Sequence, residues 1–120
     1  MGIVLALVDD LIFQAKLAET ARQAGVQLKI VTSGEALIAE AQAARLALVI
    51  VDLNARGGPV EAVEKLREAG IGAPVVAFLS HVQVELAERA RAAGCEQVLP
   101  RSKFRRELAT ILRQAKSDNP

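Results

Sequence analysis

Short apolar runs and amphipathic stretches alternate five times along this chain of 120 residues. The predicted strands occupy residues 3–8, 27–31, 46–51, 75–79 and 97–99, and the second of them alternates apolar and polar residues, which suits an edge strand with one solvated face. Such alternation is typical of a parallel sheet with helices on both faces. Right-handed crossovers favour strand order 2-1-3-4-5, so we predict a doubly wound, flavodoxin-like α/β fold in three layers. The first and fifth helices should cover one face, and the other three the opposite face.

Turn and cap residues set the expected helix boundaries. Gly25 is suited to end the first helix, because glycine accepts the left-handed conformation found there. Thr32 and Glu35 have capping-box spacing and predict the start of the second helix, and Pro59 predicts the first residue of the third. The fourth helix should occupy residues 82–93, and the fifth should follow Ser102. The expected buried face of the fifth helix consists of Phe104, Leu108, Ile111, Leu112 and Ala115.

Composition limits the class of protein. Hydrophobic residues make up 52% of the chain and the net charge is +1, which indicates a self-sufficient core and argues against a general polyanion partner. We expect one domain over residues 1–116 and a loose tail over 117–120. No apolar run reaches the roughly 20 residues that span a bilayer, and the apolar start has no basic flank. We therefore expect a cytoplasmic protein without membrane contact. Cys95 is the single cysteine and should be a packing residue.

Acidic residues follow two of the apolar runs directly. Asp9 and Asp10 follow the first run, and Asp52 follows the third. The predicted strand order makes these strands neighbours, so the three carboxylates should share one pocket at the carboxyl edge of the sheet. Clustered like charges need a neutralising partner, and oxygen ligands suit Mg²⁺. The alternative for Asp9 or Asp10 is a simple helix cap.

This pattern resembles the receiver domain of two-component response regulators over almost the whole chain. The resemblance implies that Asp9 and Asp10 hold Mg²⁺ together with the phospho-accepting Asp52, and that the backbone carbonyl of Asn54 completes the metal shell. It also implies that the hydroxyl of Ser80 is the switch group, although a serine there is also a common helix cap.

The function implied by the resemblance is phosphorelay signalling by a module that is not itself an enzyme. A sensor histidine kinase or a small phosphodonor would supply the phosphoryl group. A partner protein would dock on the face formed by the fourth helix, the fifth strand and the fifth helix, and a homodimer is also open. Residues 101–116 carry six basic side chains against one acid, which favours an acidic partner, although a solvated face explains them as well. The scarcity of aromatic residues argues against nucleic acid.

Several positions depart from the receiver pattern. Arg101 and Ser102 stand where the family has Lys-Pro, with Lys103 as a shifted alternative for the lysine. Val98 takes the place of the aromatic switch residue, and Arg56 is placed where its charge could replace that of a metal. These departures support a second hypothesis, a degenerate pseudo-receiver that acts in protein interaction or dimerisation without phosphorylation.

One further function and two residue roles are weaker hypotheses. A small hydrolase or magnesium-dependent phosphatase on the same fold is disfavoured, because no substrate-cap domain or separate acid–base pair is visible. His81 is the one histidine, and we interpret it as a loop residue rather than a phosphoryl relay. Gly57 and Gly58 lack the lysine of a phosphate-binding loop, so a flexible turn is the better interpretation.

Overall fold

The computed structural model describes residues 2–80 and 83–117, which form a five-stranded parallel sheet with helices on both faces. The strand order β2-β1-β3-β4-β5 confirms the predicted topology. The strands are β1 (Ile3–Leu7), β2 (Leu28–Val31), β3 (Leu46–Asp52), β4 (Val75–Leu79) and β5 (Gln97–Pro100). The helices are α1 (Leu11–Ala24), α2 (Gly34–Ala43), α3 (Pro59–Glu68), α4 (Val84–Ala93) and α5 (Arg101–Ser117).

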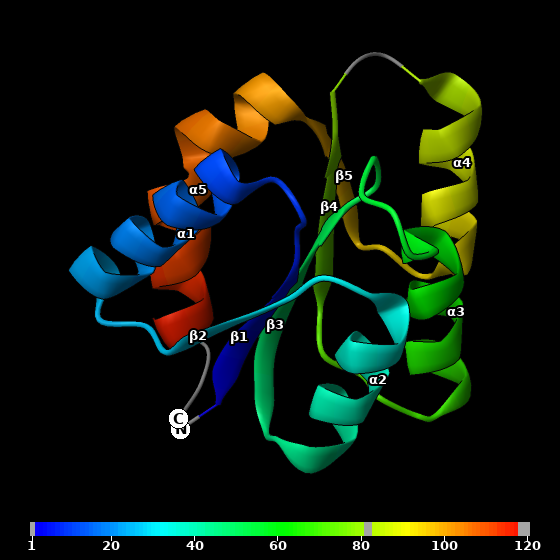
Figure 1. Ribbon diagram of the computed structural model, residues 1–120, viewed down its shortest axis with the longest axis horizontal. Coiled ribbons are helices and arrows are strands. Elements are labelled where there is room, and N and C mark those ends of the chain that lie inside the picture. Colours follow the sequence, from blue (N-terminus) through cyan, green and yellow to red (C-terminus); the bar gives the residue numbers. More distant parts are fainter. Residues whose placement is uncertain (1, 81–82, 118–120) are drawn as a thin grey trace.

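The helices divide between the two faces of the sheet as expected. Figure 1 shows α1 and α5 together on one side and α2, α3 and α4 on the other. Apolar residues of β1 and β3 are buried on both faces of the sheet, which explains why these strands are continuous apolar runs in the sequence. Within the described residues, every helix is too short or too polar to cross a membrane.

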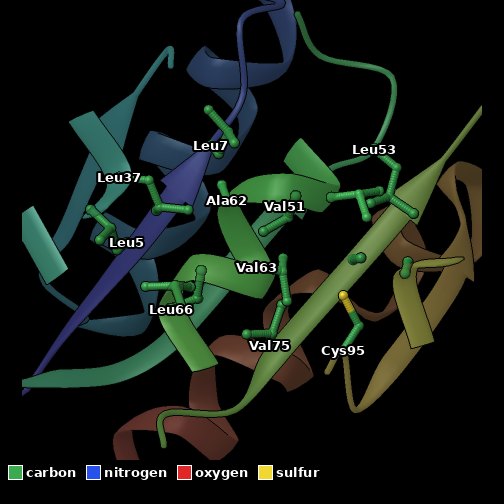
Figure 2. Packing of buried hydrophobic residues seen from close by; sticks show 14 of the residues in the cluster. Leu5, Leu7, Leu37, Val51, Leu53, Ala62, Val63, Leu66, Val75 and Cys95 are labelled. Atoms are coloured by element: carbon green, nitrogen blue, oxygen red, sulfur yellow. The ribbon is translucent and has the colours of Figure 1, made fainter. Parts of the chain in front are cut away.

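Each face of the sheet has its own hydrophobic core. On one face, Leu5 and Leu7 of β1 pack with Val63 and Leu66 of α3, and Figure 2 shows these side chains converging. Cys95 belongs to this core as a packing residue, and burial raises the pKa of its thiol to about 11. On the other face, the predicted apolar side of α5 is buried against the sheet: Phe104, Leu108, Ile111, Leu112 and Ala115.

Two predicted helix starts are wrong, by one residue for α2 and by two residues for α5. Ser33, not Thr32, caps α2, because its side chain accepts the backbone N–H of Ala36 three residues on. Helix α5 begins at Arg101, directly after β5, so Ser102 lies inside its first turn. The predicted positions of Gly25 and Pro59 at helix ends are confirmed.

The backbone of Gly57 and Gly58 adopts a conformation that favours glycine, since both residues have positive φ angles, 90° and 70°. Side chains are disfavoured in this region, so the pair shapes the turn before α3.

Three parts of the sequence predictions lie outside the described residues: His81, residue 82 at the start of the predicted fourth helix, and residues 118–120 of the predicted tail. Residue 117 ends α5.

Arg67 joins three segments at the edge of the sheet opposite the acidic residues. Its guanidinium donates to the carbonyls of Ile71 and Ala73 at 2.8 and 2.9 Å, and to the carbonyl of Gly94 at 2.9 Å. It also pairs with Glu96 at 2.9 Å. The end of α3 is thereby tied to the segments that precede β4 and β5.

We predict that Arg67→Met lowers the free energy of unfolding by about 2–3 kcal/mol, because several partly buried carbonyls lose a charged donor. Arg89→Met is the matched control, since Arg89 meets Glu61 at 3.4 Å with both side chains more than half exposed. Its loss should cost less than about 0.5 kcal/mol. Urea denaturation measures both values, and equal small losses would show that Arg67 does not hold these segments together.

Candidate functional site

The predicted carboxylates gather at the carboxyl edge of the two central strands. Asp52 is the last residue of β3, and Asp9 and Asp10 lie in the link between β1 and α1. Strands β1 and β3 are paired in register up to Leu7 and Val51, so the three acids follow neighbouring strand ends. Asp52 is 2% exposed and is the one buried polar or charged residue among those described.

Asp10 caps a helix and also faces Arg101. Its Oδ1 accepts the backbone N–H groups of Ile12 and Phe13 at 2.9 and 3.1 Å, which starts α1. Its Oδ2 lies 3.7 Å from a guanidinium nitrogen of Arg101. The capping interpretation therefore holds for Asp10, and the residue contributes charge to the pocket at the same time.

Arg101 places a positive charge among these acids. Its Nη2 donates to Asp52 Oδ2 at 3.2 Å, while Nη1 faces Asp10. The guanidinium carbon also lies 5.2 Å from the ring centroids of both Phe13 and Phe78, a distance typical of cation–π contacts. Lys103, the shifted alternative, is exposed. Arg101 is thus the basic side chain that reaches Asp52.

An aromatic cluster lies beneath Arg101 and was not predicted from the sequence. Phe78 stacks on Phe104 with ring centroids 4.5 Å apart, and Phe13 lies 5.0 Å from Phe78. The three rings come from α1, β4 and α5. The chain contains three Phe residues and neither Trp nor Tyr. This small number was the only feature of the sequence that could have drawn attention to the cluster.

Asp9 is held by the loop that follows β3. Its Oδ2 accepts the backbone N–H of Arg56 at 3.0 Å and lies 3.4 Å from Arg56 Nε. The backbone hydrogen bond is the main reason that the pKa of Asp9 is lowered. The Arg56 side chain is 94% exposed, so its charge does not fill the pocket as the sequence suggested.

Asn54 connects the two loops that border the pocket. Its backbone N–H donates to Asp52 Oδ1 at 2.9 Å. Its side-chain oxygen accepts the backbone N–H of Ser80 at 2.7 Å, and its Nδ2 donates to Gln83 Oε1 at 3.0 Å. The sequence suggested only a backbone role for Asn54, because the partners of a side-chain amide cannot be read from spacing. Ser80 itself is exposed at the end of β4.

Opposing effects act on the Asp52 carboxyl group. Burial raises its pKa, and the negative charges of Asp9 and Asp10 act in the same direction. The hydrogen bond from Asn54 and the charge of Arg101 act against this shift, but they do not cancel it. Asp52 is therefore a buried acid whose charge is compensated in part.

The comparisons with known proteins identify the fold. No family model and no curated protein matches the sequence. Among solved structures, the chemotaxis response regulator CheY4 of Vibrio cholerae matches with a TM-score of 0.81 at 24% identity, over 96% of this chain and 98% of that one. The receiver domain of a Francisella response regulator matches with a TM-score of 0.85 at 14% identity, over the full length of both chains.

The chain has the receiver fold. A third match is the receiver domain of the sensor histidine kinase PA1611 of Pseudomonas aeruginosa, with a TM-score of 0.81 at 22% identity over 97% of this chain and 98% of that one. That structure has a magnesium ion coordinated in its active-site cleft.

The acids of this receiver fold do not form a metal cage as they are arranged here. Their oxygens are of the kind that Mg²⁺ prefers. However, the described residues include no group of three or more acidic, histidine or cysteine side chains placed to hold a metal. Arg101 faces both Asp52 and Asp10, and Arg56 binds Asp9. The structure thus pairs these carboxylates with arginine.

We predict that Asp52→Asn becomes more stable relative to the wild type as the pH rises. A raised pKa in the folded state means that the favourable contribution of Asp52 is present at low pH and is lost as the carboxyl ionises. The relative stability should be constant where the carboxyl group is protonated in both the folded and the unfolded state, and should then shift in favour of the variant as the pH rises to neutral. Urea denaturation across this pH range measures the shift, and a shift in favour of the wild type would contradict the assigned cause.

Proposed function

We propose that this chain is a signalling receiver module that accepts a phosphoryl group on Asp52. The observation that carries the proposal is the bridge that Arg101 makes between Asp52 and Asp10 at the carboxyl edge of the sheet. This edge is where open α/β sheets bind their ligands. The receiver fold of the structural neighbours supports the same proposal.

The proposed step is nucleophilic attack by a carboxylate. An Asp52 oxygen forms a bond to phosphorus while the bond from phosphorus to the donor's nitrogen or oxygen breaks, and the leaving group takes the electron pair. Arg101 stabilises the negative charge on the transferring group, since its guanidinium is already fixed beside Asp52 Oδ2. Magnesium bound by Asp9, Asp10, Asp52 and the Asn54 carbonyl stays a prediction, and no step above requires it.

The proposed partners follow from the same assignment. A sensor histidine kinase or a small phosphodonor supplies the phosphoryl group in the cytoplasm. A partner protein with an acidic surface docks on the face formed by α4, β5 and α5. Five basic side chains of α5 are exposed and form no ion pair with other described residues: Lys103, Arg105, Arg106, Arg113 and Lys116.

One observation supports a second candidate, a pseudo-receiver that binds partners or dimerises without phosphorylation. Asp9, Asp10 and Asp52 each meet an arginine of the same chain. The pocket is therefore partly neutralised before any donor or metal arrives.

Incubation with acetyl phosphate or phosphoramidate, followed by intact mass spectrometry, tests the proposal. We predict a phosphoryl adduct that is absent in Asp52→Ala. Arg101→Ala should lower the rate of adduct formation by at least about tenfold, because the fixed positive charge is lost. Lys103→Ala is the matched control and should react at the wild-type rate, since Lys103 is exposed.

Parallel reactions with Mg²⁺ and with EDTA separate the two sources of positive charge. An adduct that requires Mg²⁺ supports the magnesium prediction, and an adduct in EDTA assigns the neutralisation to Arg101. The absence of an adduct under both conditions contradicts the proposal and leaves the pseudo-receiver.

A further inference from the structure

The guanidinium of Arg101 has two kinds of partner. Its terminal nitrogens face the acidic residues, with Nη2 3.2 Å from Asp52 Oδ2 and Nη1 3.7 Å from Asp10 Oδ2. Its central carbon lies over the rings of Phe13 and Phe78, 5.2 Å from each ring centroid. The carboxylates compensate the charge of Arg101, and the rings limit the orientations that its guanidinium plane can take.

The hydrophobic core holds both rings in place. Phe78 is 0% exposed and Phe13 is 4% exposed. Phe78 is stacked on Phe104 with a centroid distance of 4.5 Å and an interplanar angle of 16°. A cation over the face of a ring is attracted by the negative charge density of that face, and more strongly where water is excluded. The side chain of Arg101 is 25% exposed, so its contact with the rings is partly shielded from water.

Each ring belongs to a residue that is tied to one of the two acids. The backbone N–H of Phe13 donates to Asp10 Oδ1 at 3.1 Å. Phe78 is the register partner of Asp52 between β3 and β4, and its carbonyl accepts the N–H of Leu53 at 2.9 Å. The backbone therefore sets the position of each ring relative to the acid beside it.

A planar ion suits this arrangement better than a point charge does. A guanidinium presents separate nitrogens to two carboxylates while its flat face stays against a ring. A lysine ammonium has one nitrogen on a flexible stem and is more strongly hydrated. At position 101, a lysine would therefore meet fewer of these partners at the same time.

We propose that Phe13 and Phe78 are positioning residues that make this site specific for arginine at position 101. The rings hold the guanidinium in the orientation in which one nitrogen faces Asp52 and the other faces Asp10. The effect on phosphoryl acceptance rests on the proposed function, whereas the positioning of Arg101 does not.

NMR of the arginine side chains tests the positioning without any phosphodonor. In the wild type, ring currents should shift the Arg101 Nε–H signal away from that of Arg105, which is exposed. Asp52→Asn should move the Arg101 signal again, because it removes a charged partner. Phe13→Leu keeps an apolar side chain in the core but removes one ring. In this variant, we expect the response of the Arg101 signal to Asp52→Asn to fall by at least about twofold.

Leu17→Ala is the matched control, because Leu17 is fully buried in the same core and lies on the same helix, α1. This change leaves a cavity and lowers the stability, but it removes no ring. The Arg101 signal should therefore respond to Asp52→Asn as it does in the wild type. An equally reduced response in Leu17→Ala would overturn the proposal, because a general loosening of the core would then explain the effect.

A double-mutant cycle on the rate of adduct formation tests the preference for arginine. Arg101→Lys should lower the rate by about fivefold in the wild type, since lysine keeps the charge but not the planar contacts. In Phe13→Leu, the same Arg101→Lys change should lower the rate by less than about twofold, because the ring contact that favours a guanidinium is weakened. Phe78→Leu measures the same coupling if Phe13→Leu proves too unstable to study.

An Arg101 signal that responds to Asp52→Asn equally in Phe13→Leu and in the wild type would overturn the proposal. Equal costs of Arg101→Lys in both backgrounds would overturn it as well, because the rings would then make no distinction between the two basic residues. If neither the wild type nor any variant forms an adduct, the proposed function fails, and the NMR response alone decides whether the rings position Arg101.

Discussion

The buried carboxylate of Asp52 is the constraint on which the site depends. An ionised group that is 2% exposed is costly unless a charge or hydrogen bond compensates it. Arg101 supplies the charge, and the backbone N–H of Asn54 supplies a hydrogen bond. Arg101 is the first residue of α5, whereas Asn54 lies in the loop after β3. Compensation of one carboxylate therefore connects the start of α5 with the loop after β3.

The position of Arg101 is itself determined by the packing below it. Arg101 begins α5 directly after β5, and its guanidinium lies against the rings of Phe13 and Phe78. Those rings are part of the core between the sheet and the layer of α1 and α5. The charge of Arg101 is thus held in place by the hydrophobic core.

The sequence predicted the parts of the fold that depend on local pattern. Continuous apolar runs identified β1 and β3, because strands buried on both faces carry apolar residues at every position. The same runs placed Asp9, Asp10 and Asp52 at one edge. The start of α2 was missed because Thr32 and Ser33 are both good caps, and only the backbone conformation selects between them.

The rest of the site depends on contacts between residues far apart in the chain. Asn54 meets Ser80 and Gln83 across 26 and 29 positions, and Arg101 meets Asp52 across 49. No spacing rule predicts which side-chain amide or guanidinium closes such a contact. The sequence suggested that the charged group of Arg56 would lie over the acidic residues. In the structure, the backbone N–H of Arg56 makes a closer contact with Asp9 than its guanidinium does.

The pKa of Asp52 measured by NMR in the wild type and in Arg101→Met tests the central claim most directly. Arg101 acts against the shift that burial imposes, so removing its charge should raise the pKa of Asp52 further. Lys103→Met removes an exposed charge of the same helix and should leave the pKa close to the wild-type value. A pKa that is unchanged or lower in Arg101→Met would show that Arg101 does not compensate the buried carboxylate.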